Sequence, residues 1–237
     1  MTNETGTLVV SEVFGPTIQG EGPSLGRRAG FIRLGGCNLT CSWCDAAYTW
    51  NASRYDLRAE LTRMPVTAMV ERALVGDPEI VVITGGEPLL HQQQAGWSEL
   101  LDQLWDADVS IEVETNGTIA PEEITRHLVT QFNVSPKLAH NGDPLSLRLR
   151  PEPLRALVET NKAVFKFVCG GVGDVHEVSR VIDEMDIPRD LVWIMPLGVT
   201  AEEVNRNLRS ITPESVNQGF NVTTRLHIYV WGDERAH

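Results

Sequence analysis

Three of the four cysteines of this 237-residue chain lie within eight residues of one another. Cys37, Cys41 and Cys44 have the spacing C-x3-C-x2-C and directly follow an apolar run that predicts a strand, Phe31–Leu34. Three thiolates on one tight loop can ligate three irons of a [4Fe–4S] cube and leave the fourth iron open to a non-protein ligand. A structural zinc site would need a fourth protein ligand. No matching Cys/His pair follows, so zinc is the weaker alternative.

A second motif, Thr84-Gly85-Gly86-Glu87-Pro88, follows the apolar run Ile80–Ile83. The two glycines allow a ligand to approach the backbone closely, and the acid can accept from an ammonium group. Alone, such a segment is more often a simple turn at the end of a strand. Its place after the next predicted strand beyond the cysteine loop favours a binding site.

The elements that must position these motifs alternate along the chain. Such alternation predicts βαβ units, a parallel sheet and ligand sites at the carboxyl ends of its strands. We expect one α/β domain over residues 1–237, a partial (open) parallel β/α barrel of about six strands, with a flexible tail over residues 1–10. Thr200 is expected to cap a helix. The predicted strands are Phe31–Leu34, Ile80–Ile83, Val109–Val113, Phe132–Val134, Val164–Val168, Leu191–Ile194 and Leu226–Val230; the predicted helices are Val66–Val75, Trp97–Ala107, Pro121–Val129, Val175–Met185 and Ala201–Leu208.

Composition narrows the class of protein. The formal net charge of −12 argues against a nucleic-acid partner held by phosphate contacts. No run approaches the roughly 18 apolar residues of a membrane helix, and the first residues lack the basic and apolar regions of a signal peptide. We therefore expect a cytoplasmic protein without a membrane partner.

The cysteine motif, with Trp43 before its last cysteine, and the Gly-Gly-Glu-Pro segment together resemble the radical S-adenosylmethionine (SAM) superfamily. The resemblance implies that SAM chelates the open iron through its amino and carboxylate groups. Gly85, Gly86 and Glu87 would hold the methionine end, and Trp43 would lie against the adenine. The cofactor supplies radical chemistry, and the protein orients it.

Further segments, from about Ser11 to Gly232, resemble the 7-carboxy-7-deazaguanine synthases within that superfamily. They are Ser11–Gly22, Cys44–Trp50, Glu114–Gly117, Ser135–Lys137, Leu226-His227 and Trp231-Gly232. The resemblance implies a carbon–nitrogen lyase of 7-deazapurine (queuosine-type) biosynthesis. Its substrate would be 6-carboxy-5,6,7,8-tetrahydropterin, which loses the C6 hydrogen, contracts its ring and releases ammonia. A homodimer and an electron donor such as flavodoxin are also implied.

The resemblance assigns roles to individual residues. Arg33 would bind the substrate carboxylate, and a guanidinium inside an apolar strand is costly unless it has a partner. Glu114 would be catalytic, although the alternation of its strand also fits a solvent-facing side chain. His227 could equally be a core histidine, and Lys137 could lie on the surface. The remaining substrate residues would be Ile18, Gln19, Gly20 and Thr84, and the remaining SAM residues Asp45, Asn116, Ser135 and Lys137.

One position departs from the family's pattern. The resemblance implies Mg²⁺ beside a Thr or Ser hydroxyl after the Asp that follows the last cysteine, but this chain has Ala46 there. A water could replace the hydroxyl, because Mg²⁺ keeps several waters. Otherwise the ion is weakly bound or absent, or the substrate is altered.

Two other functions stay open from the sequence. One is an activase that generates a glycyl radical in a partner protein, which would need a broad docking surface. The other is a non-catalytic binding module with a structural zinc. The Ile18-Gln19-Gly20 segment and Arg33 favour a small anionic ligand instead.

Overall fold

A computed structural model describes residues 6–236, and its strands form one open sheet in the order β3-β1-β2-β4-β5-β6-β7-β8-β9. β1 is antiparallel to both of its neighbours, and every pairing from β2 to β9 is parallel. The predicted open, mainly parallel sheet is confirmed. The strands are β1 (Thr7–Ile18), β2 (Arg28–Leu34), β3 (Thr62–Pro65), β4 (Ile80–Gly85), β5 (Ser110–Thr115), β6 (Gln131–Val134), β7 (Ala163–Cys169), β8 (Val192–Pro196) and β9 (Asn221–Val222).

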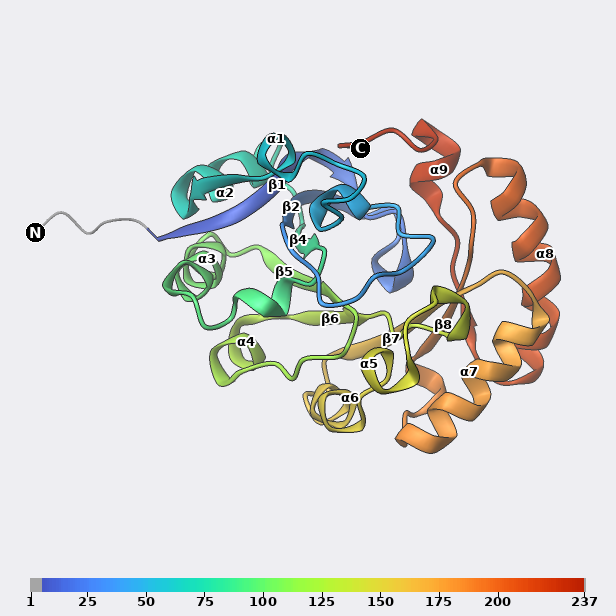
Figure 1. Cartoon of the computed structure of the whole chain (residues 1–237). Helices are drawn as coiled ribbons and strands as arrows, with labels where there is room; N and C mark the ends of the chain where they lie inside the picture. The colour runs from blue at the N-terminus through green and yellow to red at the C-terminus, as the bar shows by residue number, and fades with distance from the viewer. Residues whose placement is uncertain (1–5, 237) are drawn as a thin grey trace, which may run out of the picture.

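The longer helices lie around the outer side of the curved sheet, and the loop after β2 crosses its inner side (Figure 1). The expected cap is present, since the Thr200 hydroxyl accepts from the Glu203 N–H at 3.2 Å. The helices are α1 (Leu57–Glu60), α2 (Val66–Ala73), α3 (Ala95–Asp106), α4 (Glu123–Leu128), α5 (Leu145–Arg148), α6 (Pro151–Val158), α7 (Val172–Met185), α8 (Ala201–Asn217) and α9 (Leu226–Trp231), with 3₁₀ turns at Gly22–Ser24, Ala47–Thr49, Pro88–His91, Ala139–Asn141 and Arg189–Leu191.

The two faces of the sheet have different chemistry. In β5, Ile111 and Val113 are fully buried in the main apolar core, whereas Glu112 and Glu114 alternate with them and project from the opposite face. The same alternation holds in β2, where Ile32 lies in the main core. Apolar side chains therefore fix the helices to the sheet, at roughly 1.5–3 kcal/mol for each large one fully buried. The inner face is left to carry polar groups.

A smaller apolar cluster closes the amino end of the inner face. It consists of Ala29, Phe31, Ile80 and Val82, with Phe14 packed against it. Because these residues fill the space at the start of the parallel strands, the polar side chains further along each strand lie at the carboxyl ends. This is the edge at which parallel sheets of this kind bind ligands.

Two sequence predictions are wrong in part. Leu226–Val230 is not a strand but forms most of α9, because the two residues of β9 already pair with β8. A short apolar run does not distinguish a strand from a helix. Residues 7–10, expected in a flexible tail, form the start of β1; residues 1–5 of that tail lie outside the described residues.

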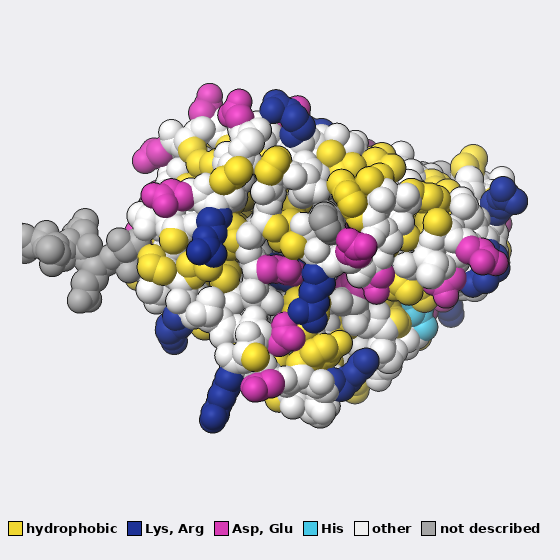
Figure 2. All heavy atoms as spheres, turned by 90° about the horizontal axis from the view of Figure 1, so that it is seen from above, with side chains coloured by type: hydrophobic (Ala, Val, Ile, Leu, Met, Phe, Trp, Pro, Cys, Tyr) yellow, Lys and Arg dark blue, Asp and Glu magenta, His cyan; other side chains and the backbone are white. Residues whose placement is uncertain are grey.

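The face that carries α1, α2 and α9 mixes acidic, basic and apolar side chains, without a continuous basic surface (Figure 2). Within residues 6–236, no helix has the length and apolar character to span a bilayer.

Candidate active site

A cavity of about 410 Å³ lies at the carboxyl ends of the parallel strands. It brings together all the predicted site residues except Glu87. They are Ile18, Gln19, Gly20, Arg33, Cys37, Cys41, Trp43, Cys44, Asp45, Ala46, Thr84, Gly85, Gly86, Glu114, Asn116, Ser135, Lys137 and His227.

Each thiol of the cysteine loop accepts at least one N–H. The donors are the Leu39 backbone to Cys37, the Asn141 side chain to Cys41 and the Trp50 indole to Cys44, each at 3.4 Å. Burial raises the pKa of Cys37 to about 12 and also raises that of Cys44. A ligating metal must therefore displace a proton from these thiols, and the N–H donors then stabilise the charge on sulfur.

The three thiols fit a cluster better than a single ion. No three or more His, Cys, Asp or Glu side chains among residues 6–236 come close enough together to hold one metal ion. In a [4Fe–4S] cube each cysteine ligates a different iron, so its sulfurs need not converge on one point. The donor set of Cys37, Cys41 and Cys44 therefore fits the cluster, and it does not favour the mononuclear zinc alternative.

The two glycines at the end of β4, Gly85 and Gly86, allow the cysteine loop to approach closely. A Cβ on Gly86 would lie 2.0 Å from the Gly36 carbonyl oxygen and 2.9 Å from the Cys37 Cβ, so no larger residue fits. Gly85 has a φ of +146° and would meet the Leu34 carbonyl. Both glycines line the cavity, yet their first effect is to bring the start of the cysteine loop against the end of β4.

Glu87 is the one predicted site residue that does not line the cavity, and its carboxylate is fully buried. One oxygen accepts from the Leu89 N–H and the Thr115 hydroxyl, and the other accepts from the Asn116 N–H at 2.7 Å. Burial raises the pKa of this carboxyl. Glu87 therefore joins the turn after β4 to the end of β5, and the structure does not place it against a ligand in the cavity.

Trp43 offers an unused donor. Its indole nitrogen is buried and has no acceptor among the described residues. The Lys137 ammonium lies 5.5 Å from its ring centre and donates to the Ser135 hydroxyl at 2.9 Å. A ligand in the cavity could accept from this indole. Asn116 is engaged instead, because its amide donates to the Asn38 side chain and its oxygen accepts from Thr118.

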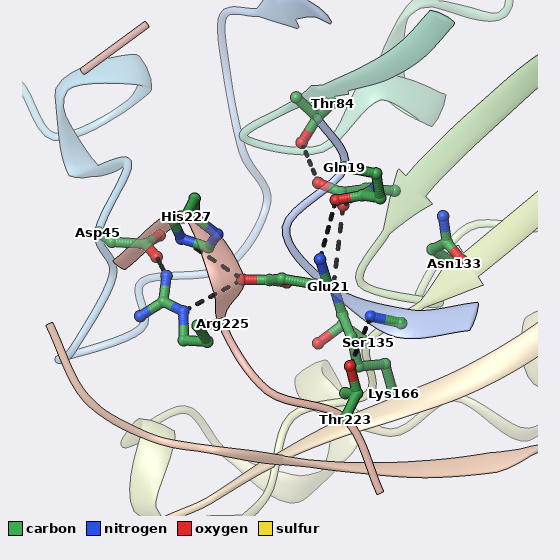
Figure 3. Close-up of polar contacts among 12 residues, drawn as sticks. Gln19, Glu21, Asp45, Thr84, Asn133, Ser135, Lys166, Thr223, Arg225 and His227 are labelled. Carbon is green, nitrogen blue, oxygen red and sulfur yellow. Dashed lines mark hydrogen bonds and ion pairs between the residues drawn. The ribbon is translucent and has the colours of Figure 1, made fainter. Parts of the chain in front are cut away.

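Gln19, Thr84 and Glu114 form one hydrogen-bonded group, of which Figure 3 labels Gln19 and Thr84. The Thr84 hydroxyl donates to one Glu114 oxygen at 2.8 Å, and the Gln19 amide donates to the other at 3.3 Å. Lys166 lies 3.7 Å from the same Glu114 oxygen and is also paired with Glu21. Glu114 thus faces the cavity rather than solvent, with both of its oxygens fixed.

Sequence reasoning missed three paired charges that line the cavity, the half-buried Glu21 and the buried Lys166 and Arg225. Burial opposes their ionisation, but each is paired. The pKa of Glu21 is therefore lowered by Lys166 and Arg225, and those of the two cations are raised. Lys166 is a charged residue inside the apolar run of β7, and the same kind of position had indicated a function for Arg33. No sequence signal distinguished Arg225.

His227 lies against Gly20 at the edge of this group. A Cβ on Gly20 would come within 2.1 Å of the imidazole Nδ1, so only glycine fits there. The imidazole Nε2 is 3.9 Å from Glu21. Burial lowers the pKa of His227, and Glu21 partly offsets this effect. His227 therefore reaches the cavity from α9, not from the strand that the sequence predicted.

Arg33 has the partner that a buried guanidinium requires. Its Nε donates to a Glu12 oxygen at 2.7 Å, and the Tyr48 hydroxyl donates to the same oxygen at 2.6 Å. The guanidinium carbon lies 6.0 Å from the ring centre of Phe14, which stacks on Phe31 at 5.0 Å. These contacts use only one of the three guanidinium nitrogens, and they hold the group at the cavity wall.

Comparison with known proteins identifies the family. Residues 31–166 match the model of the radical SAM superfamily. The chain is 41% identical to the 7-carboxy-7-deazaguanine synthase of Pyrobaculum aerophilum, over 96% of each chain. It is 35% identical to that of Hyperthermus butylicus, over 94% of this chain and 92% of the relative. The chain belongs to the 7-carboxy-7-deazaguanine synthase family.

A solved member of this family has the same fold. The crystal structure of QueE from Escherichia coli aligns with a TM-score of 0.67 and 25% identity, covering 93% of this chain and 95% of that one. The likeness extends beyond the matched superfamily segment, since residues 31–166 omit β1 and the strands after β7. The likeness to the 7-carboxy-7-deazaguanine synthase family therefore covers most of the chain, well beyond residues 31–166.

Proposed function

We propose that the chain is a radical SAM lyase that converts 6-carboxy-5,6,7,8-tetrahydropterin to 7-carboxy-7-deazaguanine, with loss of the C6 hydrogen and release of ammonia. One observation carries the proposal. A single cavity is lined both by the three clustered thiols and by the Gln19–Thr84–Glu114 group. A cofactor bound at a cluster on these thiols would thus be held next to a polar substrate.

Cys37, Cys41 and Cys44 would hold a [4Fe–4S] cluster. The residues that would bind SAM beside it are Trp43, Asp45, Gly85, Gly86, Asn116, Ser135 and Lys137, all of which line the cavity. When bound, the cluster and SAM supply abstraction of a hydrogen atom from an unactivated carbon. The Trp43 indole donates toward the cavity, and the Lys137 ammonium offers a positive charge to a carboxylate or an adenine face.

The substrate would be oriented by the polar inner face. Glu114 accepts from N–H groups of the pterin while the Thr84 hydroxyl and the Gln19 amide keep its carboxylate in place. Arg33 has nitrogens not used by Glu12, and these can bind the substrate carboxylate in a planar pair. Ile18, Gly20 and His227 also line the cavity and limit the space that is left for the substrate. The protein thus fixes the ring while hydrogen transfer takes place.

The activase alternative is not favoured. The relatives that match nearly the whole chain are synthases of a small molecule. The polar groups converge inside the cavity rather than on an exposed face. An electron donor such as flavodoxin, a homodimer and a cytoplasmic location are further proposals, which rest on the family resemblance.

The function is tested by anaerobic incubation of the reconstituted protein with the carboxypterin, SAM and a reductant, followed by mass analysis. The expected product has the mass of 7-carboxy-7-deazaguanine, and SAM is regenerated rather than consumed in proportion. A Glu114→Gln variant should retain the cluster absorbance and lose most turnover. Unchanged carboxypterin in a sample with an intact cluster would refute the proposed substrate.

A further inference from the structure

The position implied for Mg²⁺ offers no free oxygen from residue 46. Ala46 lines the cavity directly after Asp45, and its side chain is a methyl group. Its carbonyl oxygen accepts from both the hydroxyl and the N–H of Thr49, at 2.7 and 3.0 Å. Mg²⁺ requires oxygen ligands in near-octahedral geometry. The remaining ligand in this segment is the carboxylate of Asp45.

That carboxylate is already bound to a guanidinium. Arg225 Nη2 donates to Asp45 at 2.6 Å and Nε donates to Glu21 at 3.1 Å (Figure 3). Its Nη1 donates to the Gly198 carbonyl at 2.6 Å. The Arg225 side chain is only 9% exposed. Three separate segments therefore hold one permanent positive charge at the cavity wall.

A divalent ion does not fit beside this group. Mg²⁺ at Asp45 would lie next to the guanidinium on the same carboxylate, and the two positive charges would repel each other. The described part of the chain contains no cluster of three acidic, histidine or cysteine ligands that could outweigh this repulsion. An ion bound to the same Asp45 oxygen would have to displace the Arg225 Nη2 donor.

We propose that Arg225 takes the place of the divalent cation, so that the reaction proceeds without Mg²⁺ and the guanidinium binds an oxygen of the anionic substrate. The three contacts use three of its five N–H donors, and it lines the cavity between Asp45 and Glu21. The inference rests on the proposed function for its choice of substrate. Its statement about the cation does not depend on turnover.

The first test measures Mn²⁺ binding by electron paramagnetic resonance, with Mn²⁺ as the probe for a Mg²⁺ site. The anaerobic holoenzyme is titrated with and without the carboxypterin. We expect no stoichiometric binding by the wild type or by Ala46→Thr, and binding of one ion by the double variant Ala46→Thr/Arg225→Gln. One Mn²⁺ bound by the wild type or by Ala46→Thr, or none by the double variant, would overturn the proposal.

The second test measures kinetics with chelator or with added Mg²⁺. Wild-type rates should be the same in both. Arg225→Gln should raise KM for the carboxypterin about 10- to 100-fold, the effect of losing a hydrogen bond to a charged group, with a smaller change in kcat. Arg225→Lys, which keeps the charge, should recover part of that loss. A KM unchanged in Arg225→Gln, with only a lower thermal midpoint, would show a purely structural ion pair and refute the substrate contact.

The two proposals fail differently. If no variant forms product under any cation condition, the proposed function is wrong, while the Mn²⁺ titration still decides whether Arg225 excludes a divalent ion. If product forms only when Mg²⁺ is added, the function stands and the role of Arg225 is refuted.

Discussion

Replacement of Lys166 by methionine tests the charge network at the floor of the cavity. The Lys166 side chain is 7% exposed and is paired with Glu21 and with Glu114. Methionine fills a similar volume but removes the charge. Both carboxylates then stay half-buried, at 14% and 24% exposed, with Arg225 as the remaining cation at Glu21.

The expected loss follows from these contacts. Removing one partner of a buried ion pair costs about 3–5 kcal/mol, because a charge stays behind without compensation. Since Arg225 still neutralises Glu21, we expect the lower end, about 3 kcal/mol. For a chain of this length that corresponds to a fall of roughly 6–12 °C in the thermal midpoint.

The assay is thermal unfolding of the anaerobic holoprotein at neutral pH, followed by circular dichroism. Lys166→Arg is the matched control, and its thermal midpoint should fall much less because it keeps the positive charge. The double variant Glu21→Gln/Lys166→Met should lose less free energy of unfolding than the two single variants lose together, since it removes one of the carboxylates that Lys166→Met leaves without its lysine partner. A midpoint of Lys166→Met within about 2 °C of the wild type, less than 1 kcal/mol, would refute the network's role.

Other predictions concern the cluster and a buried histidine. Cys41→Ala should fold with an unchanged far-ultraviolet circular dichroism spectrum but lack the cluster absorbance near about 400 nm. Cys169→Ala, which changes a buried cysteine of β7, should keep that absorbance. Activity in Cys41→Ala would contradict its assignment as a cluster ligand. Asn141→Ala removes the N–H donor to Cys41 and should make the cluster's reduction potential more negative, with the exposed Asn205→Ala as control; equal potentials would count against that contact. Burial lowers the pKa of His91, so the unfolded chain binds the proton more readily. The free energy of unfolding should therefore fall as the pH drops below about 6.5, by at most about 1.4 kcal/mol per pH unit, and it should fall less in His91→Gln. An equal fall in the wild type and in His91→Gln would show that His91 does not cause it.

The parallel part of the sheet could be predicted because β2 and β4–β8 have apolar cores bounded by turn residues. β1 was missed because Gly15-Pro16 interrupts its pattern, although the strand continues through the register shift between Phe14 and Thr17. The strand expected over Leu226–Val230 failed because a run of five mainly apolar residues fits either structure. Local pattern thus predicts strands that are regular and buried, but not those that depend on their neighbours.

The candidate site was predictable where spacing itself carries the chemistry. Cys37, Cys41 and Cys44 are close in sequence, so their shared role is visible without a structure. Arg225 is 180 residues from Asp45, and only the fold brings the two together. The contacts of Glu87 were likewise out of reach of the sequence, because only the fold brings its carboxylate to the Asn116 N–H at the end of β5. Sequence identifies a ligand loop better than it identifies a buried charge network.

The most direct test of the account is electron paramagnetic resonance of the reduced, reconstituted protein before and after addition of SAM. Three cysteine ligands leave one iron without a protein ligand, so binding of SAM there should change the spectrum of the [4Fe–4S] cluster. We predict a clear change with SAM in the wild type and no cluster signal in Cys41→Ala. A cluster spectrum that is identical with and without SAM would contradict the account.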